Sequence, residues 1–163
     1  RDVIAVGKIF DIFDGEGVTE KIKTTGNTNG IAFTKALQTR DFEGLAFVNL
    51  VDFDMLYGHR RDVAGYAAAA TEFDKFVADF IPGMREGDIL MVTADHGCDP
   101  SYTKTTDHTR EYVPYLICGK GVKPGVDLGT KLCFGTIAHT ICDYLGVDAS
   151  TLDVQSVLGD ILA

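Results

Sequence analysis

The sequence predicts an α/β protein with a parallel-dominated sheet and helices on both faces. Strand-like apolar runs alternate along the chain with segments whose apolar residues recur at helical spacing, which is typical of this class. The length of 163 residues is ordinary for one domain. Apolar residues make up 45% of the chain and charged residues 24%, so a core can form and a disordered chain is excluded.

Four apolar runs have the length and composition of strands. We expect strands at residues 3–7, 45–51, 88–94 and 113–119. The run at 45–51 is nearly continuous in apolar residues, as in a strand that is buried on both faces. Pro114 has no backbone N–H, so the last strand either begins there or lies toward an edge of the sheet.

Three segments between and after these strands have helical periodicity. The first covers residues 31–39 and follows a turn and cap at 27–30; the second covers 62–81 and the third 134–145. The apolar stripe of the second helix is expected to run through Tyr66, Ala70, Phe73, Val77 and Phe80. Pro82-Gly83 ends that helix, and Gly146 is placed to cap the third. The tail from Ser150 is predicted to form a short helix.

The charge balance excludes several classes of partner. Lys plus Arg number 15 and Asp plus Glu number 24, a formal net charge of −9. Such acidity argues against a nucleic-acid or anionic-membrane surface, because both require a basic footprint. No apolar run approaches the roughly 18–20 residues of a membrane span, and no signal peptide is evident. The four cysteines form no C-x-x-C pair, so we expect reduced thiols in a cytoplasmic protein.

Three pairs of aspartate and histidine stand near the ends of predicted strands. The pairs are Asp54 with His59, Asp95 with His96, and Asp107 with His108. The first two follow the strands at 45–51 and 88–94, and ligands of open α/β sheets lie beyond such carboxyl ends. Carboxylate and imidazole donors suit Mn²⁺, Zn²⁺ or Fe²⁺. One such pair is more often a solvated turn, but three together predict a divalent metal centre.

Other polar residues nearby have two readings each. Arg60 and Arg61 are either a solvated helix start or, near a metal site, a holder of phosphate. Asp52 either supports the metal ligands or faces solvent. Cys98 and Asp99 are expected to be loop structure, with support of the metal ligands as the alternative. His139 lies off the apolar stripe of its helix and is predicted to be a surface residue.

Several of these segments resemble the phosphopentomutase family of the alkaline phosphatase superfamily. The resemblance rests on the runs TADHGCDP at 93–100 and TDHTRE at 106–111, with NLVDFDMLYGHR at 49–60. The segments 7–13 and 15–19 fit the same family, so the match extends from about residue 4 to residue 148. The resemblance implies an alkaline phosphatase-like core, of which residues 1–163 form the C-terminal, metal-binding part.

The resemblance also implies a role for individual residues. Asp54, His59 and His108 would bind one manganese ion, and Asp95 with His96 would bind a second; these five residues are the implied ligands. Lys8 would lie near the sugar-phosphate substrate, although a solvated lysine is an equal reading. The family interconverts α-ribose 1-phosphate, or its 2-deoxy form, with the 5-phosphate through a phosphothreonine that bridges two manganese ions.

The implied nucleophilic threonine, one aspartate ligand of the second metal and a cap domain would all lie upstream of Arg1. The second metal site is therefore expected to be incomplete in this chain, and the chain alone is expected to be inactive as a mutase. Alternatives are another two-metal enzyme, such as a cofactor-independent phosphoglycerate mutase or a phosphatase, or a metal-binding domain without catalysis.

Overall fold

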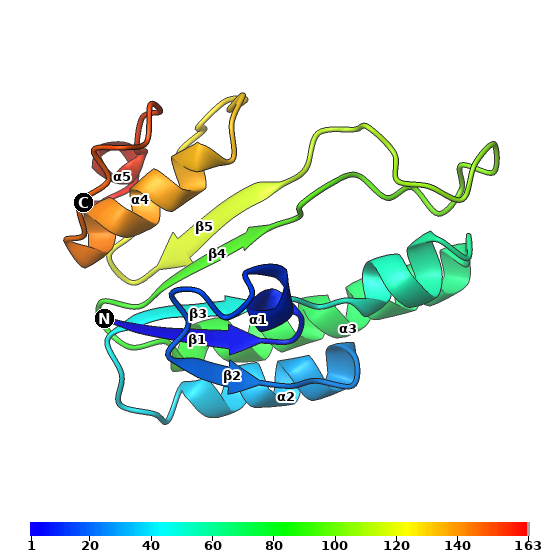
Figure 1. Cartoon of the computed structure of the whole chain (residues 1–163), viewed down its shortest axis with the longest axis horizontal. Coiled ribbons are helices and arrows are strands. Elements are labelled where there is room, and N and C mark those ends of the chain that lie inside the picture. Colours follow the sequence, from blue (N-terminus) through cyan, green and yellow to red (C-terminus); the bar gives the residue numbers. More distant parts are fainter. Residues whose placement is uncertain (163) are drawn as a thin grey trace. The chain divides into compact units, whose positions relative to one another are not determined.

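The computed structural model describes residues 1–162 and divides them into two compact units (Figure 1). The first unit consists of residues 1–85 and 92–116, and the second of residues 86–91 with the chain from Ile117 onward. Length alone predicts one domain, and the sequence contains no linker-like stretch that would have indicated the division.

The first unit is built on a three-stranded sheet in the order β2-β1-β3. The strands are β1 (Asp2–Val6), β2 (Glu20–Ile22) and β3 (Gly44–Val48). Both pairings of β1 are parallel, with Ala5 opposite Lys21 on one side and Phe47 on the other. Residues 4–6 of β1 are at most 1% exposed and form the centre of the core. The predicted parallel α/β class is confirmed.

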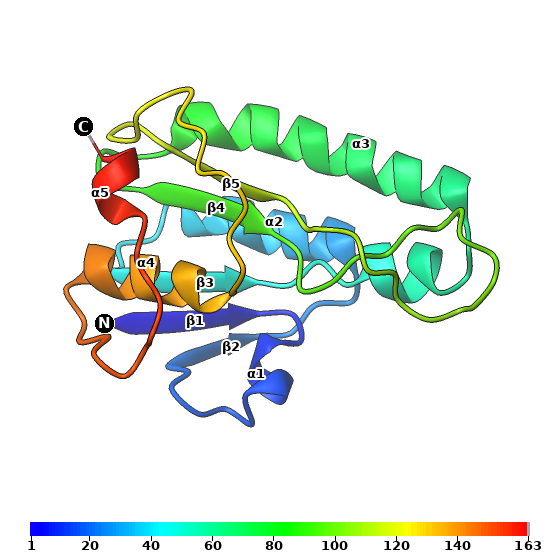
Figure 2. The ribbon, with the colours of Figure 1, turned by 90° about the horizontal axis from the view of Figure 1, so that it is seen from above.

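The helices of the first unit pack against this sheet and against one another. They are α1 (Ile9–Ile12), α2 (Asn27–Leu37), a π-helical turn η1 (Phe53–Gly58), α3 (Val63–Phe80) and a 3-10 turn η2 (Ile81–Gly83). Both α1 and α2 contact β1, and α3 packs against α2 and η1 (Figures 1 and 2).

The remaining elements are two strands and two helices. Strands β4 (Ile89–Thr93) and β5 (Tyr115–Gly119) pair with each other as a second sheet. In the second unit, α4 (Gly135–Leu145) packs against α5 (Leu158–Ile161). Gly146 closes α4 at a φ of 63°, as its position in the sequence predicts. The tail predicted to be helical from Ser150 forms a helix only at Leu158–Ile161.

The strand expected at 45–51 is shorter and less buried than its composition indicates. β3 ends at Val48, and the chain turns through Asn49 and Leu50 into η1. Phe47 is 42% exposed and contacts the ring of Phe13, so β3 is not buried on both faces. Within residues 1–162, β3 is paired to β1 but not to β4, whereas the sequence indicates a single sheet.

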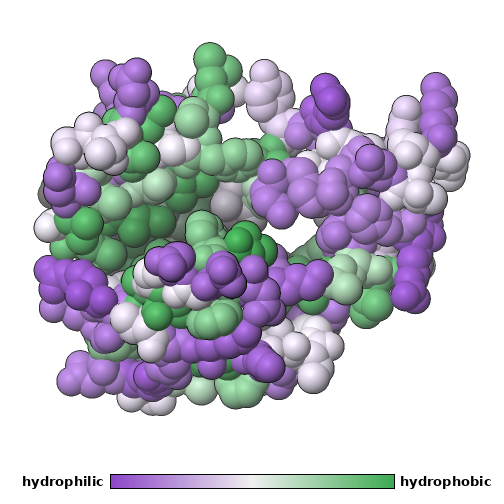
Figure 3. Space-filling model, in the orientation of Figure 1, coloured by the Kyte–Doolittle hydropathy of each residue, from purple (hydrophilic) through white to green (hydrophobic). Residues whose placement is uncertain are grey.

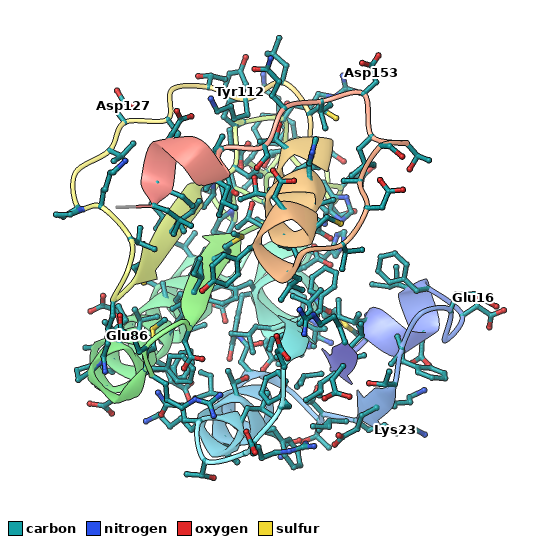
Figure 4. The ribbon with its side chains drawn as sticks, turned by 90° about the vertical axis from the view of Figure 1, so that its left-hand side faces the viewer. Glu16, Lys23, Glu86, Tyr112, Asp127 and Asp153 are labelled. Carbon is teal, nitrogen blue, oxygen red and sulfur yellow. The ribbon has the colours of Figure 1, made fainter. Side chains whose placement is uncertain are left out.

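Two short elements, α1 and β2, were not predicted. β2 contains two charged residues in three and lies at the edge of its sheet, where polar side chains are favoured. Glu16 and Lys23, on either side of it in sequence, are exposed and point away from the ribbon (Figure 4). A three-residue polar edge strand has no hydrophobic period by which it can be recognised.

The first predicted helix begins four residues earlier than expected, because Asp52 caps it. The backbone N–H of Asn27 donates to Asp52 Oδ2 at 2.7 Å, and the N–H of Asp52 donates to Asn27 Oδ1 at 2.9 Å. Asn27 is 4% exposed and Asp52 is half-buried, so this reciprocal pair is partly shielded from water. The carboxylate of Asp52 is therefore used to fix the start of α2 to the segment that follows β3.

The long helix α3 agrees closely with its predicted bounds, but its buried face differs. Asp62 caps it by accepting the N–H of Gly65 at 2.9 Å. Its fully buried residues are Ala69 and Phe76, whereas Ala70 is exposed. The stripe therefore runs through positions 66, 69, 73, 76 and 80, with the rings of Phe76 and Phe80 in contact. In an alanine-rich segment, alternative stripes differ little in hydrophobicity.

Among residues 1–162, no helix combines the length and the apolar composition needed to span a membrane.

Candidate metal centre

Three of the predicted ligands converge in the first unit. Nε2 of His59 lies 3.2 Å from Asp54 Oδ1, and Nε2 of His108 lies 3.3 Å from the same oxygen. One ligand atom from each residue falls within 4.8 Å of the others, and this is the one such group found among residues 1–162. The loop that carries His108 lies beside η1 in both ribbon views (Figures 1 and 2).

The π-helical turn explains how Asp54 and His59 reach one site. The N–H of His59 donates to the carbonyl of Asp54 at 3.0 Å, an i to i+5 bond. This bond places residues five apart one above the other, whereas an α-helix would turn them well apart. The spacing of five residues between an aspartate and a histidine is therefore a sequence signal for a π-turn that helical periodicity does not detect.

The ring of His59 is oriented by the backbone. Its Nδ1 lies 2.5 Å from the carbonyl oxygen of Thr106, and a carbonyl can only accept. Nδ1 can therefore only donate in this contact, and Nε2 is the ring nitrogen on the side of Asp54 that is left for a metal. His108 is held by Asp107, whose Oδ1 accepts the backbone N–H of His108 at 2.8 Å. That hydrogen bond is the main reason that the pKa of Asp107 is lowered.

The second predicted pair is only partly associated with this group. The imidazole of His96 stacks on that of His108, with centroids 3.6 Å apart and planes 17° apart. Its Nδ1 lies 3.1 Å from the carbonyl of Gly97. The side chain of Asp95 is 78% exposed, with Oδ1 3.6 Å from His96 Nε2. His96 is thus beside the three-donor group, while a second metal at Asp95 and His96 stays a prediction.

Two further residues, Cys98 and Gly58, pack against the candidate ligands or against each other. Cys98 Sγ lies 3.7 Å from Asp54 Oδ1, and burial followed by the charge of Asp54 raises the pKa of this thiol. Gly58 is buried against Cys98, and any β-carbon there would overlap with Sγ and crowd the carbonyl of Phe53. The tight turn between the two ligands of η1 therefore requires glycine.

Three basic residues with predicted roles, Lys8, Arg60 and Arg61, differ in exposure and in their contacts. Lys8 is exposed, and its Nζ donates to Met55 Sδ at 2.7 Å, which places the ammonium group beside η1. Arg60 is exposed, as a solvated helix start would be. Arg61 is not a solvated residue of this kind, because its guanidinium donates to backbone carbonyls, among them that of Asp99 at 3.0 Å.

The prediction that His139 is a surface residue is wrong. In the second unit its side chain is 24% exposed, and Nδ1 lies 2.6 Å from the carbonyl of Val154. Its Nε2 is 3.5 Å from Oδ1 of Asp143, one turn further along α4. The residue lies off the apolar stripe because its ring contacts the C-terminal tail.

The donor set fits a divalent transition metal. One carboxylate and two neutral imidazoles provide borderline and hard donors, the combination that manganese, zinc or iron accepts. The anchoring of His59 on a backbone carbonyl is the usual support for a histidine ligand. The surface of this loop region, at the right of the view, is mostly polar (Figure 3).

Known proteins agree with this assignment. The metalloenzyme superfamily matches residues 4–149. A phosphopentomutase of Acetivibrio thermocellus is 53% identical over 160 residues, which are 98% of this chain and 41% of that protein. The phosphopentomutase of Lachnoclostridium phytofermentans is 54% identical over 145 residues, 89% of this chain and 37% of the relative. The chain therefore spans about two fifths of the length of these relatives. By this match over most of its length, the chain belongs to the metalloenzyme superfamily.

Proposed function

We propose that this chain carries the first metal site of a phosphopentomutase. The enzyme would interconvert α-ribose 1-phosphate, or its 2-deoxy form, with the 5-phosphate. The observation that carries the proposal is the convergence of Asp54, His59 and His108 in a chain 53% identical to a phosphopentomutase. The alternatives of a phosphoglycerate mutase, a phosphatase or a non-catalytic domain are outcomes of the test below.

The three donors would hold one manganese ion. Asp54 supplies the negative charge, and the two imidazoles supply neutral donors whose Nε2 atoms face the same oxygen. The Thr106 carbonyl keeps the proton of His59 on Nδ1, so the ligand is ready without a tautomer change. A metal bound here would supply positive charge to phosphoryl oxygens, which stabilises negative charge in the transition state.

Other groups would complete the site. Asp95 and His96 would contribute to a second manganese ion, with further ligands and the nucleophilic threonine provided by residues outside these 163. The stacking of His96 on His108 supports this placement, since it brings the second imidazole next to the first site. Lys8 would bind the sugar phosphate, because its ammonium group lies beside Met55, the neighbour of Asp54.

The proposal extends to the state of the chain and its location. If the threonine lies outside this chain, the 163 residues alone have no mutase activity. We place the protein in the cytoplasm, which is supported by the four free cysteines.

The test is an activity assay of the full-length protein with Mn²⁺, using ribose 1-phosphate and 3-phosphoglycerate as separate substrates. We expect turnover of ribose 1-phosphate, abolished in Asp54→Asn and retained in His139→Ala, whose imidazole belongs to the other unit. Turnover of 3-phosphoglycerate alone would contradict the pentomutase assignment. Turnover of neither substrate despite metal binding would favour a phosphatase or a non-catalytic domain.

A further inference from the structure

The guanidinium of Arg61 uses all of its donors on backbone carbonyls. Nε donates to Thr105 at 3.0 Å, Nη2 to Thr105 and Asp107 at 2.5 Å each, and Nη1 to Gly58 at 3.2 Å and Asp99 at 3.0 Å. An arginine has five N–H donors, and these are five hydrogen bonds. No N–H remains for a phosphate, so the reading of Arg61 as a phosphate holder is not supported.

These bonds join two segments that are far apart in sequence. Gly58 ends η1, whereas Asp99, Thr105 and Asp107 belong to the loop between β4 and β5. Between residues 99 and 108 that loop has short turns, such as the bond from the N–H of Tyr102 to the carbonyl of Asp99, but no helix or strand. A single side chain therefore ties an irregular loop to the turn that carries the other two metal ligands.

The carbonyls that Arg61 binds are next in sequence to the two residues that shape the candidate metal site, Thr106 and His108. Thr105 and Asp107 flank Thr106, whose carbonyl orients His59, and Asp107 directly precedes His108. Fixing the carbonyls on both sides of Thr106 fixes its own carbonyl between them. The same contacts limit where the side chain of the next residue, His108, can lie.

The backbone of Arg61 is itself in an unfavourable conformation. Its φ is +56°, in the left-handed region that side chains other than glycine rarely adopt. Its N–H donates to the carbonyl of Gly58 at 3.0 Å, which closes the turn after η1. Such a conformation persists where surrounding interactions impose it, and it is concentrated at functional sites. Glycine would adopt this φ with less strain than arginine. We therefore infer that the arginine side chain has a role at this position.

We propose that Arg61 is a positioning residue that clamps the loop at 99–107 onto η1 and thereby sets the positions of His108 and of the Thr106 carbonyl. The inference rests on the metal site of the proposed function, although not on the identity of the sugar. Lysine would not replace arginine, because one ammonium group cannot span four carbonyls in a fixed fork.

The test compares Arg61→Gly and Arg61→Lys with Arg60→Ala in the full-length protein. Arg61→Gly keeps the left-handed turn without strain, so the fold is retained while the clamp is lost. Arg60→Ala removes the same charge at an exposed neighbouring position. Affinity is measured by titration with Co²⁺ alone, followed by its visible absorption, and loop order by hydrogen exchange of the amides at 101–108.

We expect Arg61→Gly and Arg61→Lys to weaken Co²⁺ binding by about 10- to 100-fold and to accelerate exchange of the loop amides, with Arg60→Ala unchanged. In the His108→Ala background, Arg61→Gly should have a smaller further effect, because the part that acts through His108 is already lost and only the part that acts through the Thr106 carbonyl and His59 is left. Wild-type affinity in either Arg61 variant, or full additivity with His108→Ala, would overturn the clamp. A wild type that binds no Co²⁺ contradicts the proposed function, whereas unchanged exchange in Arg61→Gly contradicts the clamp.

Discussion

Two histidines in different units have the same backbone anchor and different surroundings. His59 places Nδ1 2.5 Å from the carbonyl of Thr106, and His139 places Nδ1 2.6 Å from that of Val154. On the opposite side of the ring, His59 faces Asp54, which also contacts His108 from a distant loop. His139 faces Asp143 on its own helix. An anchored imidazole beside a carboxylate is therefore common to both units.

The difference between the two regions is the second imidazole. His108 comes from a loop that Arg61 ties to η1, so three donors meet around one oxygen of Asp54. Around His139 the anchor joins α4 to the C-terminal tail and stabilises the fold of the second unit. A histidine with an acidic neighbour is thus part of a candidate metal site where a separate segment supplies a third donor.

The most direct way to remove the difference is His108→Ala. This change leaves one carboxylate and one imidazole, the same pair that surrounds His139. We expect Mn²⁺ affinity to fall by more than about 100-fold, since loss of a residue that only supports a ligand already costs 10- to 100-fold. Isothermal titration calorimetry of the full-length protein measures the change.

The matched control is His139→Ala, which removes an imidazole from the second unit that also has a carboxylate beside its Nε2. Its Mn²⁺ affinity should equal that of the wild type. An unchanged affinity in His108→Ala would remove this residue from the site.

The same His139→Ala variant is expected to affect stability and not metal binding. It leaves the carbonyl of Val154 without its partner in a partly buried position. Loss of one such hydrogen bond lowers the free energy of unfolding by about 1–2 kcal/mol. Urea denaturation, followed by circular dichroism, measures this change. A midpoint equal to that of the wild type would show that the anchor contributes no stability.

The sequence predicts most of the regular fold, because helices and strands can be recognised from the period at which their apolar residues recur. The buried residues of β1 follow from an apolar run, and the end of α4 follows from Gly146. The start of α2 could not be predicted, since it depends on Asp52, which is distant in sequence. The division of the strands into two sheets also depends on long-range pairing that no local pattern encodes.

The candidate site was predicted by residue type and only in part by arrangement. Asp54, His59 and His108 were recognised as donors, and the structure brings them together. The role of Arg61 could not be read from the sequence, because its partners are backbone carbonyls and any residue can provide those. Gly58 is similar, since only the contact with Cys98 shows why a side chain is excluded there.

The smallest predicted effect concerns two thiols, one in each region. Burial raises the pKa of both Cys98 and Cys118, but only Cys98 also lies beside a carboxylate, that of Asp54. The negative charge of Asp54 disfavours the thiolate, so its removal in Asp54→Asn lowers the pKa of Cys98 toward the ordinary value. At any pH below that pKa, the thiolate fraction of Cys98 then increases.

The reaction is run in EDTA, which keeps metal from neutralising Asp54. Iodoacetamide should then modify Cys98 about two- to tenfold faster in Asp54→Asn than in the wild type. The range follows because one pKa unit is a tenfold change in the thiolate fraction. The midpoint of the rate against pH should move to lower pH. Cys118 is the internal control, because its shift comes from burial alone, and peptide mass spectrometry follows both residues. An equal acceleration of the two thiols would indicate general loosening of the fold, and no acceleration of Cys98 would contradict the electrostatic contact with Asp54.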